Sequence, residues 1–219
     1  MSESIDLTPS PRVLRMLGEI DFKAWQCLCE IIDNSIDAFN SSSSTLEPSI
    51  KVKLPGASQH QIRPTDQLII EDNADGMTYE DLSKSLKAGF SANSPIDKMG
   101  LFGMGFNIST ARLGYRTEVI TSTKESNEFL KVTIDFQELE EEGHFDAPVK
   151  RIPKKADEIG RHGTTIAVTK LRADHIRPLY QRKKITKKLG KIYGRVIREK
   201  KIKLNYAGSP CKPVRHCVW

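Results

Sequence analysis

The sequence predicts an α+β fold, a two-layer α/β sandwich in which helices cover a mainly antiparallel mixed sheet. Its 219 residues are 38% hydrophobic, which suits one α/β domain or one domain and the start of another. The predicted helices and strands follow one another without the regular alternation that a doubly wound parallel sheet requires. No stretch approaches about 18 uninterrupted apolar residues, so we expect no membrane partner.

The helices are predicted from capping residues and apolar periodicity. Thr8-Pro9-Ser10-Pro11 is typical of a helix start and Gly18 of its end, and Asp21 is predicted to cap a longer helix. The expected helices cover residues 11–17, 21 to about 39, 78–87, 103–105 to 113, and 175–199.

The strands are predicted from short runs of β-forming residues between turn signals. They are expected at residues 50–54, 67–70, 116–122, 129–136 and 163–169, with another beginning near 201. Between them, residues 88–103 are rich in Gly, Ser, Asn and Pro. A loop of that length in a compact domain is usually functional or mobile.

Charge divides the chain unevenly. Residues 181–219 hold 13 Lys and Arg against one acid, giving +12, whereas residues 1–180 carry −6. The basic segment suits DNA or RNA, but a solvated helix face or a site for an anionic ligand would have the same composition.

The four cysteines form no Cys-x-x-Cys pair, so a structural zinc site has little support. The acidic amino terminus lacks an apolar signal core. These two observations predict reduced thiols and a cytoplasmic protein.

The helix after Trp25 carries a polar stripe. Gln26, Glu30, Asp33, Asn34 and Asp37 recur at spacings of three and four, which places them on one face. A carboxylate can accept a proton from water, and a neutral amide oxygen can bind Mg²⁺. An ordinary exposed acidic helix face is the alternative interpretation.

Two further segments suit a ligand. Asp72 ends a buried strand before the turn 73–76, which a plain Asx turn would also explain. A calcium loop is excluded because Leu82 occupies the position that needs a bidentate Glu. The glycines of 100–105 precede a predicted helix and so suit an anion, although a hinge without a ligand would use the same residues.

Taken in order, these segments resemble the GHKL ATPases, a superfamily that includes gyrase-type topoisomerases, the ninety-kilodalton heat-shock chaperones, MutL proteins, histidine kinases and MORC proteins. Residues 30–38 resemble the first box, Glu-x-x-x-Asn-x-x-Asp-Ala, and residues 72–77 the second. Residues 100–105 resemble the third and Gly163-Thr164-Thr165 the fourth. The resemblance implies a Bergerat-type fold, with ATP and Mg²⁺ as ligands.

The resemblance also implies residue roles. Glu30 would activate water, Asn34 would bind Mg²⁺, and Asp72 would accept a hydrogen bond from the adenine amino group with help from Thr164. The remaining residues expected around the nucleotide are Asp37, Gly76, Met77, Lys98, Gly100, Leu101, Phe102, Gly103, Met104, Gly105 and Phe106. Ala74 departs from the family, which usually has glycine there, and a positive φ at this alanine would cost about 1 kcal/mol.

Residues 88–91, 100–106 and 112–114 look most like MORC proteins and their bacterial relatives. The resemblance implies slow Mg-dependent ATP hydrolysis that drives lid closure and dimerisation, as the motor of a larger DNA-related or defence protein. A chaperone-like or MutL-like repair module is the alternative. We expect the ATP-binding domain at 1–175, and a basic helix with the truncated start of a transducer-like domain at 176–219.

Overall fold

The computed structural model describes residues 16, 18–42, 46–56, 62–86, 105–143 and 146–214. The helix expected at 11–17, apart from Met16, and the loop expected at 88–103 therefore lie outside the described residues. The helices are α2 (Ala24–Asn40), α3 (Tyr79–Leu86), α4 (Gly105–Leu113), α5 (Phe136–Glu142), α6 (Ala173–Ile176), α7 (Arg182–Ile192) and α8 (Gly194–Glu199), with 3-10 turns at Ala156–Glu158 (η1) and Arg177–Tyr180 (η2).

The sheet has eight described strands in the order β5-β4-β3-β6-β2-β1-β7-β8. They are β1 (Ser49–Lys53), β2 (Leu68–Asp72), β3 (Gly114–Ser122), β4 (Glu128–Asp135), β5 (Val149–Pro153), β6 (Gly163–Leu171), β7 (Lys203–Tyr206) and β8 (Ser209–Pro210). Every pairing is antiparallel except that of β1 with β7. The predicted α+β sandwich with a mainly antiparallel sheet is confirmed.

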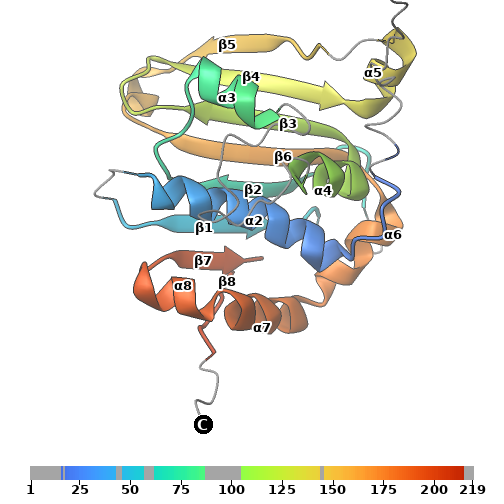
Figure 1. Ribbon diagram of the computed structural model, residues 1–219, viewed down its shortest axis with the longest axis vertical. Coiled ribbons are helices and arrows are strands. Elements are labelled where there is room, and N and C mark those ends of the chain that lie inside the picture. The colour runs from blue at the N-terminus through green and yellow to red at the C-terminus, as the bar shows by residue number, and fades with distance from the viewer. Residues whose placement is uncertain are drawn as a thin grey trace, which may run out of the picture.

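The core lies between the sheet and one layer of helices (Figure 1). Alternate strand residues face this layer because side chains of a strand point to opposite faces. Leu68 and Ile70 of β2 are buried there, beside Ile166 and Val168 of β6. Residues at intervening positions, such as Glu71, lie on the opposite face of the sheet.

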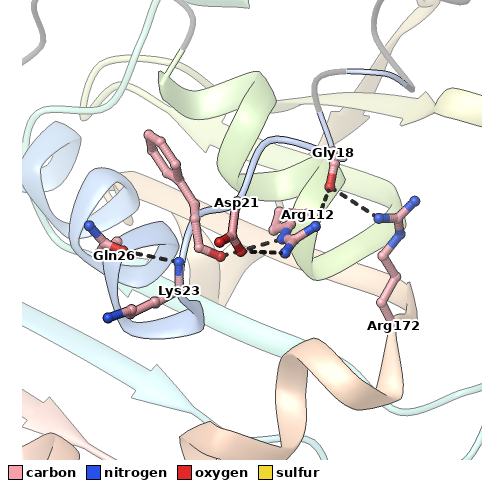
Figure 2. Close-up of polar contacts among 7 residues, drawn as sticks. Gly18, Asp21, Lys23, Gln26, Arg112 and Arg172 are labelled. Carbon is pink, nitrogen blue, oxygen red and sulfur yellow. Dashed lines mark hydrogen bonds and ion pairs between the residues drawn. The ribbon is translucent and has the colours of Figure 1, made fainter.

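The start of α2 differs from the prediction. Its N-cap is Lys23, whose backbone N–H donates to Gln26 Oε1 at 3.0 Å. Asp21 instead forms an ion pair with Arg112 of α4, at 3.2 Å (Figure 2). Arg112 and Arg172 both donate to the carbonyl of Gly18, each at 3.1 Å. Two arginines thus hold the segment that leads into α2. The Asp21 side chain pairs with one of them and does not cap the helix.

The basic helix predicted at 175–199 is wrong as a single helix, because the segment is divided into α6, η2, α7 and α8. Pro178 at the start of η2 has no amide hydrogen to continue α6. The second break is at Tyr193, where the backbone has φ −95° and ψ 9°. After this segment β7 joins the same sheet as β1, and the separate transducer-like domain expected at 176–219 stays a prediction.

Helix α5 and strand β5 were not predicted. The sequence of α5 is acidic and has no clear apolar period, so its capping residues define it. Asp135 accepts from Gln137 N at 3.2 Å and from Glu138 N at 3.4 Å, and Gly143 ends the helix with φ +72°. Within the described part of the chain, no helix combines the length and apolar character needed to cross a bilayer.

Candidate functional site

Glu30 belongs to α2, and its carboxylate lies against the start of α4. The two helices pack against each other, and a Cβ added to Gly105 would overlap Glu30 Oε2. Glycine at the first position of α4 therefore lets the carboxylate reach the helix backbone. Burial raises the pKa of Glu30 above its ordinary value, which suits a group that accepts a proton.

The polar stripe of α2 is divided in the structure. Asn34 is exposed, and Asp37 is half-buried near the carboxyl end of the helix, where Asn40 Nδ2 donates to it at 3.3 Å. Asp33 contacts Tyr193, whose hydroxyl donates to its Oδ1 at 2.7 Å, whereas Glu30 contacts α4. Burial raises the pKa of Asp33 to about 6, and the bond from Tyr193 opposes this change.

Asp72 is the last residue of β2 and points toward α2. Its Oδ1 accepts from the backbone N–H groups of Ala74, at 3.1 Å, and Thr164, at 3.2 Å. Its Oδ2 accepts from Ser35 Oγ at 2.9 Å. Burial raises the pKa of Asp72, and these three donors oppose the change. A carboxylate has about four acceptor positions. The described residues therefore leave one position on Oδ2 for a further donor.

The turn after Asp72 is an Asx-type turn held from several sides. Positive φ among the described non-glycine residues is confined to Lys170, Lys201 and Ala207, so Ala74 carries no left-handed strain. Its carbonyl accepts from His162 Nδ1 at 2.7 Å. Gly76 has φ +74°, and a Cβ there would overlap the carbonyl of Ser122. The turn therefore requires glycine at position 76 and tolerates alanine at position 74.

Thr121 was not predicted from the sequence, and it joins three parts of this region. Its hydroxyl is buried; it accepts from Met77 N at 3.0 Å, donates to Gly163 O at 3.1 Å, and lies 3.0 Å from Thr164 Oγ1. Because its single hydrogen goes to the Gly163 carbonyl, the Thr164 hydroxyl donates to Thr121. No motif marks Thr121 in the sequence, and only the observed strand register sets it opposite Thr164.

Gly163 and Ser35 also lie at the site without having been predicted as site residues. Gly163 has φ +112°, and a Cβ there would overlap the carbonyl of Asp72. This close approach lets β6 deliver the Thr164 amide to Asp72. Ser35 directly follows Asn34 in the first box. Its position in the sequence of α2 gave no sign that it faces Asp72.

The site residues expected in the glycine loop are only partly described. Lys98, Gly100, Leu101, Phe102, Gly103 and Met104 lie outside the described residues. Gly105 begins α4 beside Glu30, and Phe106 packs, partly buried, against the core. The expected phosphate contacts of the loop stay predictions.

A cavity of about 600 Å³ opens on the opposite face of the sheet. Its walls include Lys51, Glu71, Ile120 and Phe129, which occupy the strand positions turned away from the helices. Glu30 and Asn34 do not line it. Asp72, Gly163 and Thr164 do line it, so the cavity adjoins the site at the carboxyl end of β2.

A magnesium ion is expected near Asn34. In the described residues no three His, Cys, Asp or Glu side chains are grouped to hold a metal ion. Mg²⁺ commonly needs only one or two protein ligands besides substrate phosphates. The exposed amide of Asn34, one turn from Glu30, fits that limited role.

A family of known proteins matches the part of the chain that contains this site. The family described as "Histidine kinase-, DNA gyrase B-, and HSP90-like ATPase" matches residues 22–171. The chain is also similar to Protein MICRORCHIDIA 4 and Protein MICRORCHIDIA 7 of Arabidopsis thaliana, with 31% identity to each over 86 residues. That segment is 39% of this chain but only 10% and 11% of the two relatives. All of the site described between α2, β2, β3, α4 and β6 falls within the family match.

Proposed function

Because the chain belongs to the family of histidine kinase-, DNA gyrase B- and HSP90-like ATPases, we propose that it binds Mg-ATP between α2, Asp72 and α4 and hydrolyses it slowly. The observation that carries this proposal is the hydrogen bonding of Asp72. Three donors fix its carboxylate, and an acceptor position stays open. Such an acceptor suits the exocyclic amine of adenine and rejects guanine, which has a carbonyl there.

In this proposal the two ends of the site have different tasks. Asp72 and Thr164 recognise the base, with Gly76 and Met77 forming the turn beneath it. Asn34 would hold Mg²⁺, which when bound supplies charge neutralisation to the phosphates. Glu30 accepts a proton from the attacking water, and its burial favours that task because a raised pKa makes the carboxylate a stronger base.

The base-recognition step is tested with Asp72→Asn. The asparagine oxygen would keep the amides of Ala74 and Thr164, which places its NH₂ group where Oδ2 now lies. A donor would then face the adenine amine, and the affinity for ATP should fall by about 10-fold to 100-fold, the value of one hydrogen bond to a charged group. The matched control is Glu71→Gln, on the neighbouring residue of β2, whose side chain pairs with Lys53 on the other face.

Calorimetry with ATP, GTP and Mg²⁺ measures these affinities. The proposal requires that wild type and Glu71→Gln bind ATP alike and prefer it to GTP. Absence of ATP binding by the wild type would refute it. Equal losses in the two variants would show instead that the end of β2, and not the Asp72 carboxylate, matters.

Hydrolysis is tested separately with Glu30→Gln. Loss of a general base lowers turnover by about 100-fold or more, while nucleotide affinity should persist. Glu80→Gln, on the exposed first turn of α3, is the control. If wild type binds ATP but releases no phosphate, the chain is a nucleotide-binding module and the catalytic role of Glu30 in this chain is refuted.

We further propose that ATP closes the 100–105 loop and promotes pairing of two copies, in a larger DNA-related or defence protein. Light scattering with and without a non-hydrolysable ATP analogue measures the pairing, and an unchanged mass would refute it. A chaperone-like or MutL-like repair role is the alternative.

A second candidate function is nucleic-acid binding by α7. Its exposed side chains are strongly basic: Arg182, Lys183, Lys184, Lys187 and Lys191. Affinity for DNA or RNA should then fall steeply as salt rises. Replacing Lys183, Lys184 and Lys187 by Gln should reduce both the affinity and the salt slope, and no binding by the wild type at low salt would exclude the function.

A further inference from the structure

The basic carboxyl-terminal helices contact α2 along its length. Lys188 Nζ lies 3.6 Å from the ring centroid of Trp25 in the first turn. Tyr193, between α7 and α8, contacts the middle of the helix, and Lys200 donates to Asn40 at its end. In both segments the contacts follow chain order, so α7 and α8 run beside α2 in the same direction (Figure 1).

Tyr193 makes the central contact of this interface. Its side chain is only 1% exposed, and its hydroxyl donates to Asp33 Oδ1 at 2.7 Å and toward the carbonyl of Cys29 at 3.2 Å. Cys29 and Asp33 are one turn apart, so a single hydroxyl holds two successive turns of α2 from the side. A contact of this kind resists rotation of the helix about its own axis.

The two residues that Tyr193 contacts directly precede Glu30 and Asn34, which in the proposed function activate water and bind Mg²⁺. Glu30 follows Cys29, and Asn34 follows Asp33. The Glu30 carboxylate already lies against Gly105 with no room for a Cβ, so a small rotation of α2 would move it out of place. A misplacement of about 1 Å can cost about 100-fold in rate.

We infer that Tyr193 is a positioning residue for Glu30 and Asn34, acting through Cys29 and Asp33. The basic helices α7 and α8 then hold α2, the helix of Glu30 and Asn34, in its rotational position. This role is independent of any ligand that their exposed lysines bind. This inference rests on the proposed ATP hydrolysis. It assigns to residues outside the family match at 22–171 an effect on the chemistry inside it.

The test compares Tyr193→Phe with Tyr206→Phe in the whole chain. Tyr206 is an equally buried tyrosine, 0% exposed, whose hydroxyl donates at 2.6 Å to the Leu179 carbonyl of η2 and not to a residue of α2. Each change removes one hydroxyl from the interior, so both variants should lose comparable thermal stability. Only Tyr193→Phe should lower the turnover number, by about 10-fold to 100-fold, while KM for ATP stays near the wild-type value.

Hydrogen exchange provides a second readout that needs no activity. In nucleotide-free protein, Tyr193→Phe should speed exchange of the amides at 29–34, and Tyr206→Phe should not. Identical turnover and exchange in the two variants would overturn the inference. If the wild type shows no turnover, the proposed hydrolysis fails, whereas an unchanged exchange rate at 29–34 in Tyr193→Phe refutes the positioning role itself.

Discussion

The substitution Thr121→Val removes the hydroxyl that joins β3 to both sides of the base-binding turn. Valine has nearly the same shape, so the change deletes the bonds to Met77 N, Gly163 O and Thr164 Oγ1 and leaves little cavity. At about 1 kcal/mol net for each bond, the free energy of unfolding should fall by about 3 kcal/mol.

The same strand provides the control. The hydroxyl of Thr117 is also buried and faces the helices, but it has no hydrogen-bond partner among the described residues. Thr117→Val should therefore leave the protein unchanged or stabilise it by about 1 kcal/mol, because a buried unpaired hydroxyl is removed.

Urea unfolding measures both variants, with the midpoint as the readout at constant slope. Calorimetry should add a weaker ATP affinity for Thr121→Val alone, since the Met77 amide and the Thr164 hydroxyl lose their shared partner. Equal destabilisation by the two substitutions would refute the reasoning, because it would mean that the hydrogen bonds of Thr121 contribute nothing beyond the shape of the side chain.

Three further substitutions test other contacts. Gly105→Ala should push the Glu30 carboxylate aside, and because that group ends a flexible side chain, turnover should fall while the melting temperature hardly changes; a normal rate would contradict this contact. Gly163→Ala should cost at least about 1 kcal/mol in urea unfolding, since its φ of +112° disfavours alanine and the Asp72 carbonyl blocks a Cβ; unchanged stability would be the opposing result. Burial raises the pKa of Asp33 from 3.8 to about 6. The charged carboxylate therefore lowers the free energy of unfolding by about 3 kcal/mol above pH 6, and this loss disappears below about pH 4, where Asp33 is protonated in both states. Asp33→Asn should therefore stabilise the protein against urea at pH 8 and not at pH 4, and a larger gain at pH 4 would show the sign to be wrong.

The sequence predicted the elements whose patterns are local. Helix α2 and strand β2 follow from apolar periodicity and from a short buried run, and the observed bounds lie within a few residues of the predicted ones. The family resemblance assigned Asp72 and Thr164 to one site, and in the structure the Thr164 backbone N–H donates to Asp72 Oδ1 at 3.2 Å. Local pattern and ordered motifs were enough for these parts.

Contacts that depend on register or on side packing could not be predicted. Thr121 belongs to no motif, and only its position opposite Thr164 in the sheet gives it a role. The polar stripe of α2 had the right period, but periodicity cannot say that Asp33 meets Tyr193 while Glu30 meets Gly105. Neighbours from distant parts of the chain give Glu30 and Asp33 different partners.

The parallel pairing of β1 with β7 has a practical consequence for anyone dividing this chain. A shorter recombinant piece ending at Leu171, where the family match ends, would lose the strand that pairs with Ser49–Val52. β1 would become an open edge able to pair with other molecules, and the side of α2 that contacts Tyr193 would face water. Such a piece should aggregate although it retains every matched motif, so expression trials are better planned to extend through β8.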